Sequence, residues 1–153
     1  MQTPFRPLGY DPQLARIIAT VESSRNPFAI RFEPSITSYD YNLLETIYKR
    51  NFLADGFPSS PTAKVIYAVS LGQYQIMGYN LYQLGYQFTV GQFLSDGSAQ
   101  NKFFGVFLNA HGINLTWQTL KTDSAALNEF ALKYNGSDAY VAAMQKAARE
   151  LGL

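Results

Sequence analysis

Glu22 is a carboxylate at the point where a helix with one apolar face is expected to end. It lies four residues after Ile18, at the edge of that face, where partial loss of water would raise the pKa of its carboxyl group toward neutrality. A general acid needs such a pKa, so Glu22 is the candidate proton donor. The alternative is an ordinary surface glutamate in the last turns of the helix. The apolar face consists of residues at helical spacing: Leu14, Ile17, Ile18 and Val21.

Two later stretches are further candidates for the site, because each lies where a helix is expected to meet a loop. Gly72-Gln73-Tyr74-Gln75 lies in a polar segment between apolar runs, and Tyr134-Asn135-Gly136 ends a helical stripe. Glycine permits positive φ and close backbone approach, while tyrosine combines an apolar ring with a polar tip. The alternatives are a simple turn at Gly72, and core packing with a helix C-cap at Tyr134 and Asn135.

The composition limits the classes of function. The chain has 153 residues, of which 47% are hydrophobic, enough for one domain with a proper core. A net charge of +1 without any Lys/Arg run argues against nucleic acid as a partner. The absence of cysteine excludes disulfides and thiolate chemistry, and the single histidine, His111, excludes a multi-histidine metal site. We therefore expect neither a metal nor a cofactor.

Apolar stripes and turn signals predict an all-α domain of seven or eight short helices, with no convincing strand pair. Asp11-Pro12 should start the first helix, with Asp as N-cap and Pro at the first helical position. Ser38 is the expected cap of a helix over 39–52. The segments expected to be non-helical are an extended lead-in over 1–10, an irregular segment over 24–38, a turn-rich linker over 55–61 and a loop over 70–78. A further helix is expected over 62–69, and helices should end at Gly85, His111 and Asn135-Gly136. The last helix should bury Tyr140, Met144, Ala147 and Leu151.

Glu22-Ser23, Gly72–Gln75 and Tyr134–Gly136 together resemble the lysozyme-like superfamily of lytic transglycosylases and goose-type lysozymes, whose motifs are Glu-Ser, Gly-Leu-Met-Gln and Ala-Tyr-Asn. The middle of the second motif departs from that pattern, and Lys133 replaces the alanine of the third. The chain is more closely similar to the bacteriophage-associated N-acetylmuramidase family. That likeness rests on Arg31-Phe32-Glu33-Pro34, Gln75-Ile76-Met77-Gly78-Tyr79-Asn80, Leu84-Gly85-Tyr86 and Phe130-Ala131-Leu132-Lys133-Tyr134-Asn135-Gly136.

The resemblance extends over about residues 19–140 and implies a single lysozyme-like catalytic domain spanning 1–153. It implies cleavage of the bond between N-acetylmuramic acid and N-acetylglucosamine in peptidoglycan, with Glu22 as general acid. Gln75 would reach the sugar or hold Glu22 from across the groove, and Tyr134 would pack on the Glu22 helix with its hydroxyl in the cleft. The substrate-binding residues implied are Ser23, Gly72, Gln75, Tyr134 and Asn135.

Most glycosidases use a second carboxyl group beside the general acid. Glu33 is the best placed candidate, because it lies in the loop that leaves Glu22. The alternative for Glu33 is a structural brace paired with Arg31. Asp40 and Asp55 are further candidates with less support.

Three kinds of protein remain possible from the sequence. They are a hydrolase, a lytic transglycosylase that forms 1,6-anhydro products, and a catalytically silent peptidoglycan-binding or structural module. The expected partner is the glycan strand of peptidoglycan, and the protein should be a monomer. No signal-peptide core and no apolar run of membrane-spanning length occur, so neither secretion nor membrane insertion is expected. The likeness to phage muramidases implies a virion component or an enzyme released at host lysis, acting on the cell wall.

Overall fold

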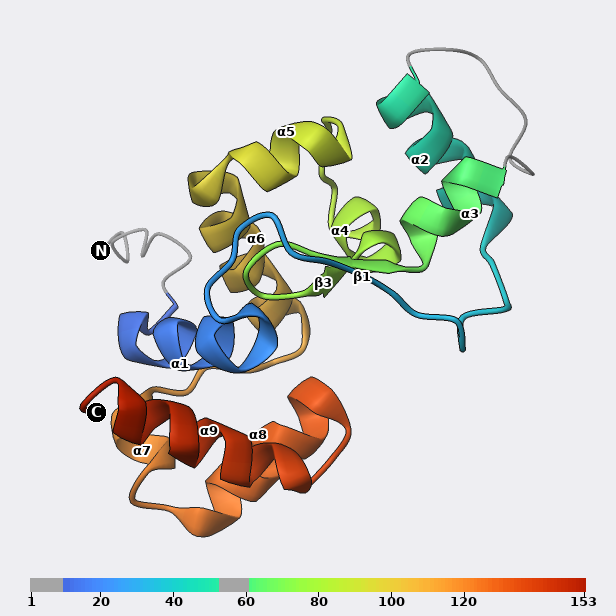
Figure 1. The fold of residues 1–153 in the computed structure, drawn as a ribbon. Helices are drawn as coiled ribbons and strands as arrows, with labels where there is room; N and C mark the ends of the chain where they lie inside the picture. The colour runs from blue at the N-terminus through green and yellow to red at the C-terminus, as the bar shows by residue number, and fades with distance from the viewer. Residues whose placement is uncertain (1–9, 53–60) are drawn as a thin grey trace, which may run out of the picture.

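The computed structural model describes residues 10–52 and 61–153 (Figure 1). These ranges contain nine helices and one small sheet, so the predicted helical class is confirmed. Residues 1–9 of the lead-in expected over 1–10, and most of the linker expected over 55–61, lie outside the described residues. The helices are α1 (Pro12–Ser23), α2 (Tyr41–Phe52), α3 (Pro61–Tyr67), α4 (Gly78–Gln83), α5 (Val90–Ser95), α6 (Gly97–Ala110), α7 (Trp117–Leu120), α8 (Ser124–Asn135) and α9 (Ala139–Glu150).

The helices form two groups with the sheet between them. Helices α2, α3 and α4 pack together at one end, while α7, α8 and α9 pack together at the other, with α1 against α9 (Figure 1). The large side chains of the core come from both groups and from α6, whose Phe104 is fully buried. Other fully buried members are Leu14, Ile17, Ile18, Leu44, Ile47, Phe130 and Met144. Among the described residues, no helix is both long enough and apolar enough to span a membrane.

Helix α1 confirms the sequence prediction at both ends. Asp11 Oδ2 accepts a hydrogen bond from the backbone N–H of Leu14 at 3.0 Å, and Pro12 occupies the first helical position. The same carboxylate oxygen accepts from the N–H of Trp117 at 2.8 Å, which ties the start of α1 to α7. Ser24 follows the helix in the left-handed region at φ 54°. The apolar face is buried, so Glu22 is fixed at its edge in the last turn.

A three-stranded antiparallel sheet replaces the irregular segment and loop predicted from the sequence. Its order is β1 (Ile30–Phe32), β2 (Val69–Leu71) and β3 (Ile76–Met77), with Arg31 opposite Ser70 and Ser70 opposite Met77. The prediction was wrong here because β1 is exposed along its whole length and β2 is buried along its whole length, so neither shows alternation. For the same reason α3 ends at Tyr67, before the expected 69, and the chain enters β2.

The start of α2 also differs from the prediction. Asp40, not Ser38, accepts hydrogen bonds at its Oδ1 from the backbone N–H groups of Asn42 and Leu43, at 2.9 and 3.1 Å, so the helix begins at Tyr41. The helix ends at His111 and Gly136 are confirmed. His111 caps α6 with its Nδ1 2.8 Å from the carbonyl oxygen of Phe107, and Gly136 caps α8 at φ 79°.

Candidate active site

A pocket of about 320 Å³ opens beside Glu22, between the sheet and the helices α4, α6 and α8. Its walls come from segments far apart in the sequence: the end of α1, strand β1 and the residues after it, the β2–β3 region, the start of α4, and the end of α8. Five of the predicted site residues line it together: Glu22, Glu33, Gln75, Tyr134 and Asn135.

Glu22 is held by a tyrosine from the last helix. The hydroxyl of Tyr140, in the first turn of α9, donates a hydrogen bond to Glu22 Oε1 at 2.7 Å. The ring of Tyr140 stacks on that of Tyr134 with centroids 5.8 Å apart. Burial raises the pKa of Tyr140 far above its usual value, so its hydroxyl remains a donor at any working pH. The carboxyl group of Glu22 therefore has one oxygen fixed and the other free of described protein donors.

The surroundings of Glu22 raise the pKa of its carboxyl group above 4.5. Burial is the largest cause, because the charged form loses water. The Tyr140 hydrogen bond and the positive charge of Arg31 oppose this by stabilising the carboxylate, and the negative charge of Glu33 adds to the increase. The net result is a carboxyl group that keeps its proton to higher pH than an exposed glutamate, as a general acid requires.

Glu33 faces the same pocket as one half of an ion pair. Arg31 Nε donates to Glu33 Oε1 at 2.6 Å, and the Glu33 N–H donates to the carbonyl of Ala68, which anchors the residue to the end of the sheet. The arginine side chain is 62% exposed, so the pair contributes little to stability. The geometry matches the brace alternative, with both charges close enough to influence Glu22. Asp40 serves α2 as its cap, and Asp55 lies outside the described residues.

Gln75 lines the pocket with its amide group committed to the sheet. Its Oε1 accepts a hydrogen bond from the buried hydroxyl of Ser70 at 2.7 Å, and its Nε2 donates to the carbonyl of Gly72 at 2.9 Å. Gln75 itself lies at φ 50°, and Gly72 at φ 74°, so both ends of the β2–β3 turn are left-handed. These bonds stabilise the shape of the turn, and no hydrogen bond among the described residues joins Gln75 to Glu22.

Ser23 and Gly72 support the pocket without lining it. The Ser23 hydroxyl donates to the carbonyl of Gln73 at 2.9 Å, which connects the end of α1 to the β2–β3 turn. A Cβ atom on Gly72 would lie 2.6 Å from Oε1 of Gln100, and that oxygen accepts a hydrogen bond from the Gln73 N–H at 2.9 Å. The close approach that Gly72 permits is therefore to a side chain of α6.

Tyr134 and Asn135 form the wall at the end of α8. The Tyr134 hydroxyl donates to the carbonyl of Tyr74 at 3.2 Å, and its ring stacks on Phe130 with centroids 5.6 Å apart. Tyr134 thus holds the β2–β3 turn at Tyr74, next to the carbonyl of Gln73 that Ser23 binds. Asn135 is exposed, and no described protein atom bonds its side chain, so its amide is available to a ligand.

Two residues that the sequence interpretation did not assign to the site prove central to it. Tyr140 was expected only as an inward-facing residue of the last helix, and it is the direct partner of Glu22, 118 positions away. Gln100 is fully buried in α6 and holds the β2–β3 turn. The one sequence signal for Gln100 is a polar residue in line with an apolar stripe, because a polar side chain buried there needs hydrogen-bond partners. Tyr79 and Asn80 belong to a segment of family likeness and also line the pocket.

This arrangement can hold a proton on a partly buried carboxyl group beside several uncommitted polar side chains. Among residues 10–52 and 61–153, no three His, Asp or Glu side chains gather in a way that could hold a metal ion. The raised pKa of the Glu22 carboxyl group in this pocket suits proton transfer to a group bound there.

Two comparisons with known proteins give matches. A family model of N-acetylmuramidases matches residues 32–150. An endolysin from Enterobacteria phage PRD1 is 34% identical over 146 residues, which cover 90% of this chain and 95% of the relative. No solved structure matches. The family match supports the lysozyme-like class of the fold, and it begins after α1, so it does not include Glu22. On the extent of this match, the chain belongs to the N-acetylmuramidase family.

Proposed function

We propose that Glu22 is the general acid of a peptidoglycan-degrading muramidase and protonates the glycosidic oxygen between N-acetylmuramic acid and N-acetylglucosamine. The observation that carries the proposal is a partly buried carboxyl group with a raised pKa, held by Tyr140 at the wall of a pocket. Cleavage passes through an oxocarbenium-like transition state, in which the departing oxygen needs a proton. Glu22 supplies it, and the carboxylate left behind is stabilised by the Tyr140 hydroxyl and by the charge of Arg31.

In the second half of the reaction the Glu22 carboxylate accepts a proton from water as that water attacks the sugar. Proton balance is thereby restored, and the product carries a reducing end. Glu33 acts through Arg31 and through its charge, which helps to set the pKa of Glu22. We assign no covalent step to Glu33, because its Oε1 is already bonded to Arg31 Nε.

The substrate contacts in this proposal come from polar groups that have no described hydrogen-bond partner in the protein. Tyr79, Asn80 and Asn135 line the pocket with such groups and suit the hydroxyl and N-acetyl groups of amino sugars. Gln75, Tyr134, Ser23 and Gly72 hold the shape of the β2–β3 turn that carries one wall. The PRD1 relative is named an endolysin, and we extend that phage-associated action on the cell wall to this chain.

Incubation of the protein with purified sacculi, followed by mass spectrometry of the soluble fraction, tests the proposal. Hydrolysis predicts muropeptides with reducing ends. Products lighter by one water would identify a transglycosylase that forms 1,6-anhydro ends. Binding to sacculi without release of soluble muropeptides would identify a catalytically silent module and end the enzyme proposal.

Tyr140→Phe is expected to shift the pH dependence of activity in a defined direction. The hydroxyl hydrogen bond lowers the pKa of Glu22, so its loss raises that pKa further. Because a general acid works in its protonated form, the alkaline limb of the activity profile should move to higher pH. Initial rates of sacculus clearing, measured from acid to mildly alkaline pH, give this limb directly.

Tyr82→Phe is the matched control for this experiment. Its hydroxyl is also buried and donates to the carbonyl of Phe88 at 2.9 Å, but it lines no part of the Glu22 pocket. The control should lose stability in a similar way while keeping the alkaline limb in place. An unmoved limb in Tyr140→Phe, or a shift to lower pH, would show that Glu22 is not the titrating acid.

A further inference from the structure

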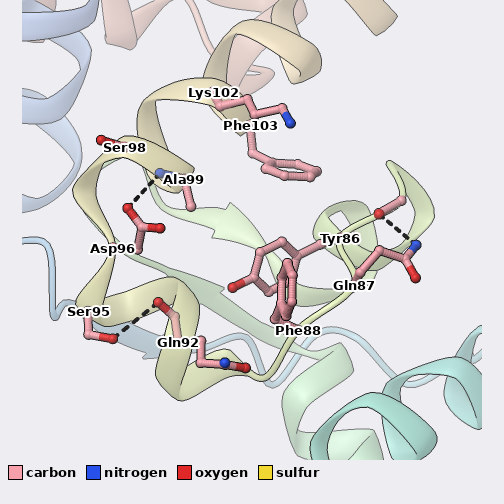
Figure 2. Close-up of a pocket in the computed structure, with 11 residues that line it drawn as sticks. Tyr86, Gln87, Phe88, Gln92, Ser95, Asp96, Ser98, Ala99, Lys102 and Phe103 are labelled. Atoms are coloured by element: carbon pink, nitrogen blue, oxygen red, sulfur yellow. Dashed lines mark hydrogen bonds between the residues drawn. The ribbon is translucent and has the colours of Figure 1, made fainter.

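A second hollow, of about 630 Å³, lies away from the Glu22 pocket and shares no lining residue with it (Figure 2). It is bounded by the loop between α4 and α5, by α5 itself, and by the first half of α6. The exposed surface of the hollow is mainly apolar, although several of its lining residues have polar side chains. Nothing in the catalytic proposal uses this hollow, although it is the larger of the two.

Three aromatic rings form its apolar surface. Tyr86 meets Phe88 and Phe103 edge to face, with centroids 5.8 and 5.3 Å apart. Figure 2 shows the rings of Tyr86 and Phe88 next to each other, with Phe103 reaching toward them from α6. Tyr86 is only 4% exposed, whereas Phe88 is 58% exposed, so one ring is a fixed support and the other is open to a ligand.

The loop that carries Phe88 is firmly held. The carbonyl of Phe88 accepts a hydrogen bond from the Tyr82 hydroxyl, and the next residue, Thr89, forms a capping box with Gln92 at the start of α5. The N–H of Val90 donates to Oδ1 of Asn51 at 2.8 Å, which connects the loop to α2. An exposed aromatic ring on a loop anchored in this way costs little conformational entropy when it binds a ligand.

The Tyr86 hydroxyl and the Lys102 ammonium are among the polar groups of this hollow that have no partner within the described part of the chain. The Tyr86 hydroxyl has no described hydrogen-bond partner, and burial followed by the charge of Asp96 raises the pKa of Tyr86 to about 12, so it is a donor at neutral pH. Lys102 has no described carboxylate within ion-pair distance. Asp96 is engaged, because its Oδ1 accepts from the N–H of Ala99 at 3.0 Å. The lining thus carries both charges: Asp96 stays negative while it caps α6, and Lys102 is the cation left for an acidic group of a ligand.

We propose that this hollow is a second, non-catalytic binding site for a peptidoglycan glycan strand. The ring of Phe88 would stack against the apolar face of an amino sugar, and Lys102 would bind a carboxylate of the attached stem peptide. The Tyr86 hydroxyl would donate to a sugar or peptide oxygen. This inference rests on the proposed function, which supplies the strand as ligand. Because the substrate is an insoluble polymer, a second contact raises the local concentration of strands at the catalytic pocket.

Co-sedimentation with purified sacculi tests the site, in a Glu22→Gln background so that the wall is not digested. Phe88→Ala is expected to weaken sedimentation by about three- to tenfold, as loss of an aromatic contact does. Lys102→Gln is expected to weaken it by about two- to fivefold at low salt, and less at high salt. On sacculi whose stem peptides have been removed by an amidase, the effect of Lys102→Gln should vanish and that of Phe88→Ala should remain.

Two matched variants serve as controls. Phe28→Ala removes a ring that is 64% exposed, and Lys121→Gln removes an exposed lysine that follows α7; neither residue lines either pocket. With Glu22 intact, Phe88→Ala and Lys102→Gln should cleave a short soluble oligosaccharide at the rate of the unmodified protein. Sedimentation equal to that of the controls would overturn the second site.

The outcomes also separate this inference from the proposed function. Normal muropeptide release with unchanged sedimentation of both variants defeats the second site alone. Absence of muropeptide release, with sedimentation still weakened by Phe88→Ala, defeats the catalytic proposal and leaves the binding site standing.

Discussion

Glu22→Gln is expected to lower the rate of muropeptide release by at least ~10²-fold, the usual contribution of a general acid. Glutamine keeps the length of the side chain and can still accept the hydrogen bond from Tyr140, so the geometry of the pocket is preserved. What is lost is the proton that the departing oxygen requires. Reducing ends released from sacculi per unit time, at equal concentrations of folded protein, measure the effect.

The same substitution should raise thermal stability above the pKa of Glu22. In the folded protein this pKa lies above its unfolded value of about 4.5, so the stability that Glu22 contributes at low pH is lost as the pH rises through the folded pKa. Glutamine avoids this loss because it has no charge to bury. The melting temperature of Glu22→Gln should therefore exceed that of the unmodified protein near neutral pH, and the difference should disappear below the unfolded pKa, where both side chains are neutral.

Glu33→Gln is the matched control, since it makes the same chemical change at the same pocket. It should keep most of the activity. Because the negative charge of Glu33 raises the pKa of Glu22, removing that charge should lower this pKa slightly. The alkaline limb of the activity profile should therefore move to lower pH. If Glu33→Gln abolishes clearing at an unchanged melting temperature while Glu22→Gln stays active, the proton donor has been assigned to the wrong carboxylate.

Gln100→Leu should be the most destabilising single change near the site. The Gln100 side chain is fully buried, and its Nε2 lies within hydrogen-bonding distance of the carbonyl oxygens of Pro27, Phe93 and Leu94, at 2.9, 3.1 and 3.2 Å. Its Oε1 accepts from the N–H of Gln73. Leucine has a similar volume and none of these bonds. Since each buried polar group left without a partner costs about 1–3 kcal/mol, the total loss should be several kcal/mol.

Thermal unfolding measures this effect, and a fall of the melting temperature by roughly 10 °C or more is expected for a domain of this size. Gln145→Leu, on the exposed face of α9, is the control for the same chemical change and should leave the melting temperature nearly unchanged. Clearing activity should fall with Gln100→Leu even at temperatures where the protein is folded, because the β2–β3 turn carries one wall of the pocket. Equal melting temperatures for the two variants would show that the Gln100 bonds do not hold the turn.

The sequence was sufficient for features that depend on a few neighbouring residues. The cap at Asp11, the buried stripe of α1 and the left-handed cap at Gly136 all follow from local hydrogen bonds and helical spacing, and the structure confirms them. The position of Glu22 at the edge of that stripe follows in the same way. The likeness of several short segments to phage muramidases could also be recognised from the sequence, and the family match confirms it.

Only the tertiary structure decided what surrounds Glu22. Strands β1 and β2 pair residues about forty positions apart, such as Ile30 and Leu71. Neither strand alternates between buried and exposed residues, so the sequence does not reveal the pairing. The bond from Tyr140 to Glu22 spans 118 positions, and that from Gln100 to the carbonyl of Pro27 spans 73. Such contacts exist because α9 packs on α1 and because α6 passes beneath the β2–β3 turn, and no spacing within a single helix encodes them. The proposed proton donor, Glu22, could thus be singled out from the sequence, whereas its burial and its hydrogen bond to Tyr140, which raise and lower its pKa, depend on packing between distant segments.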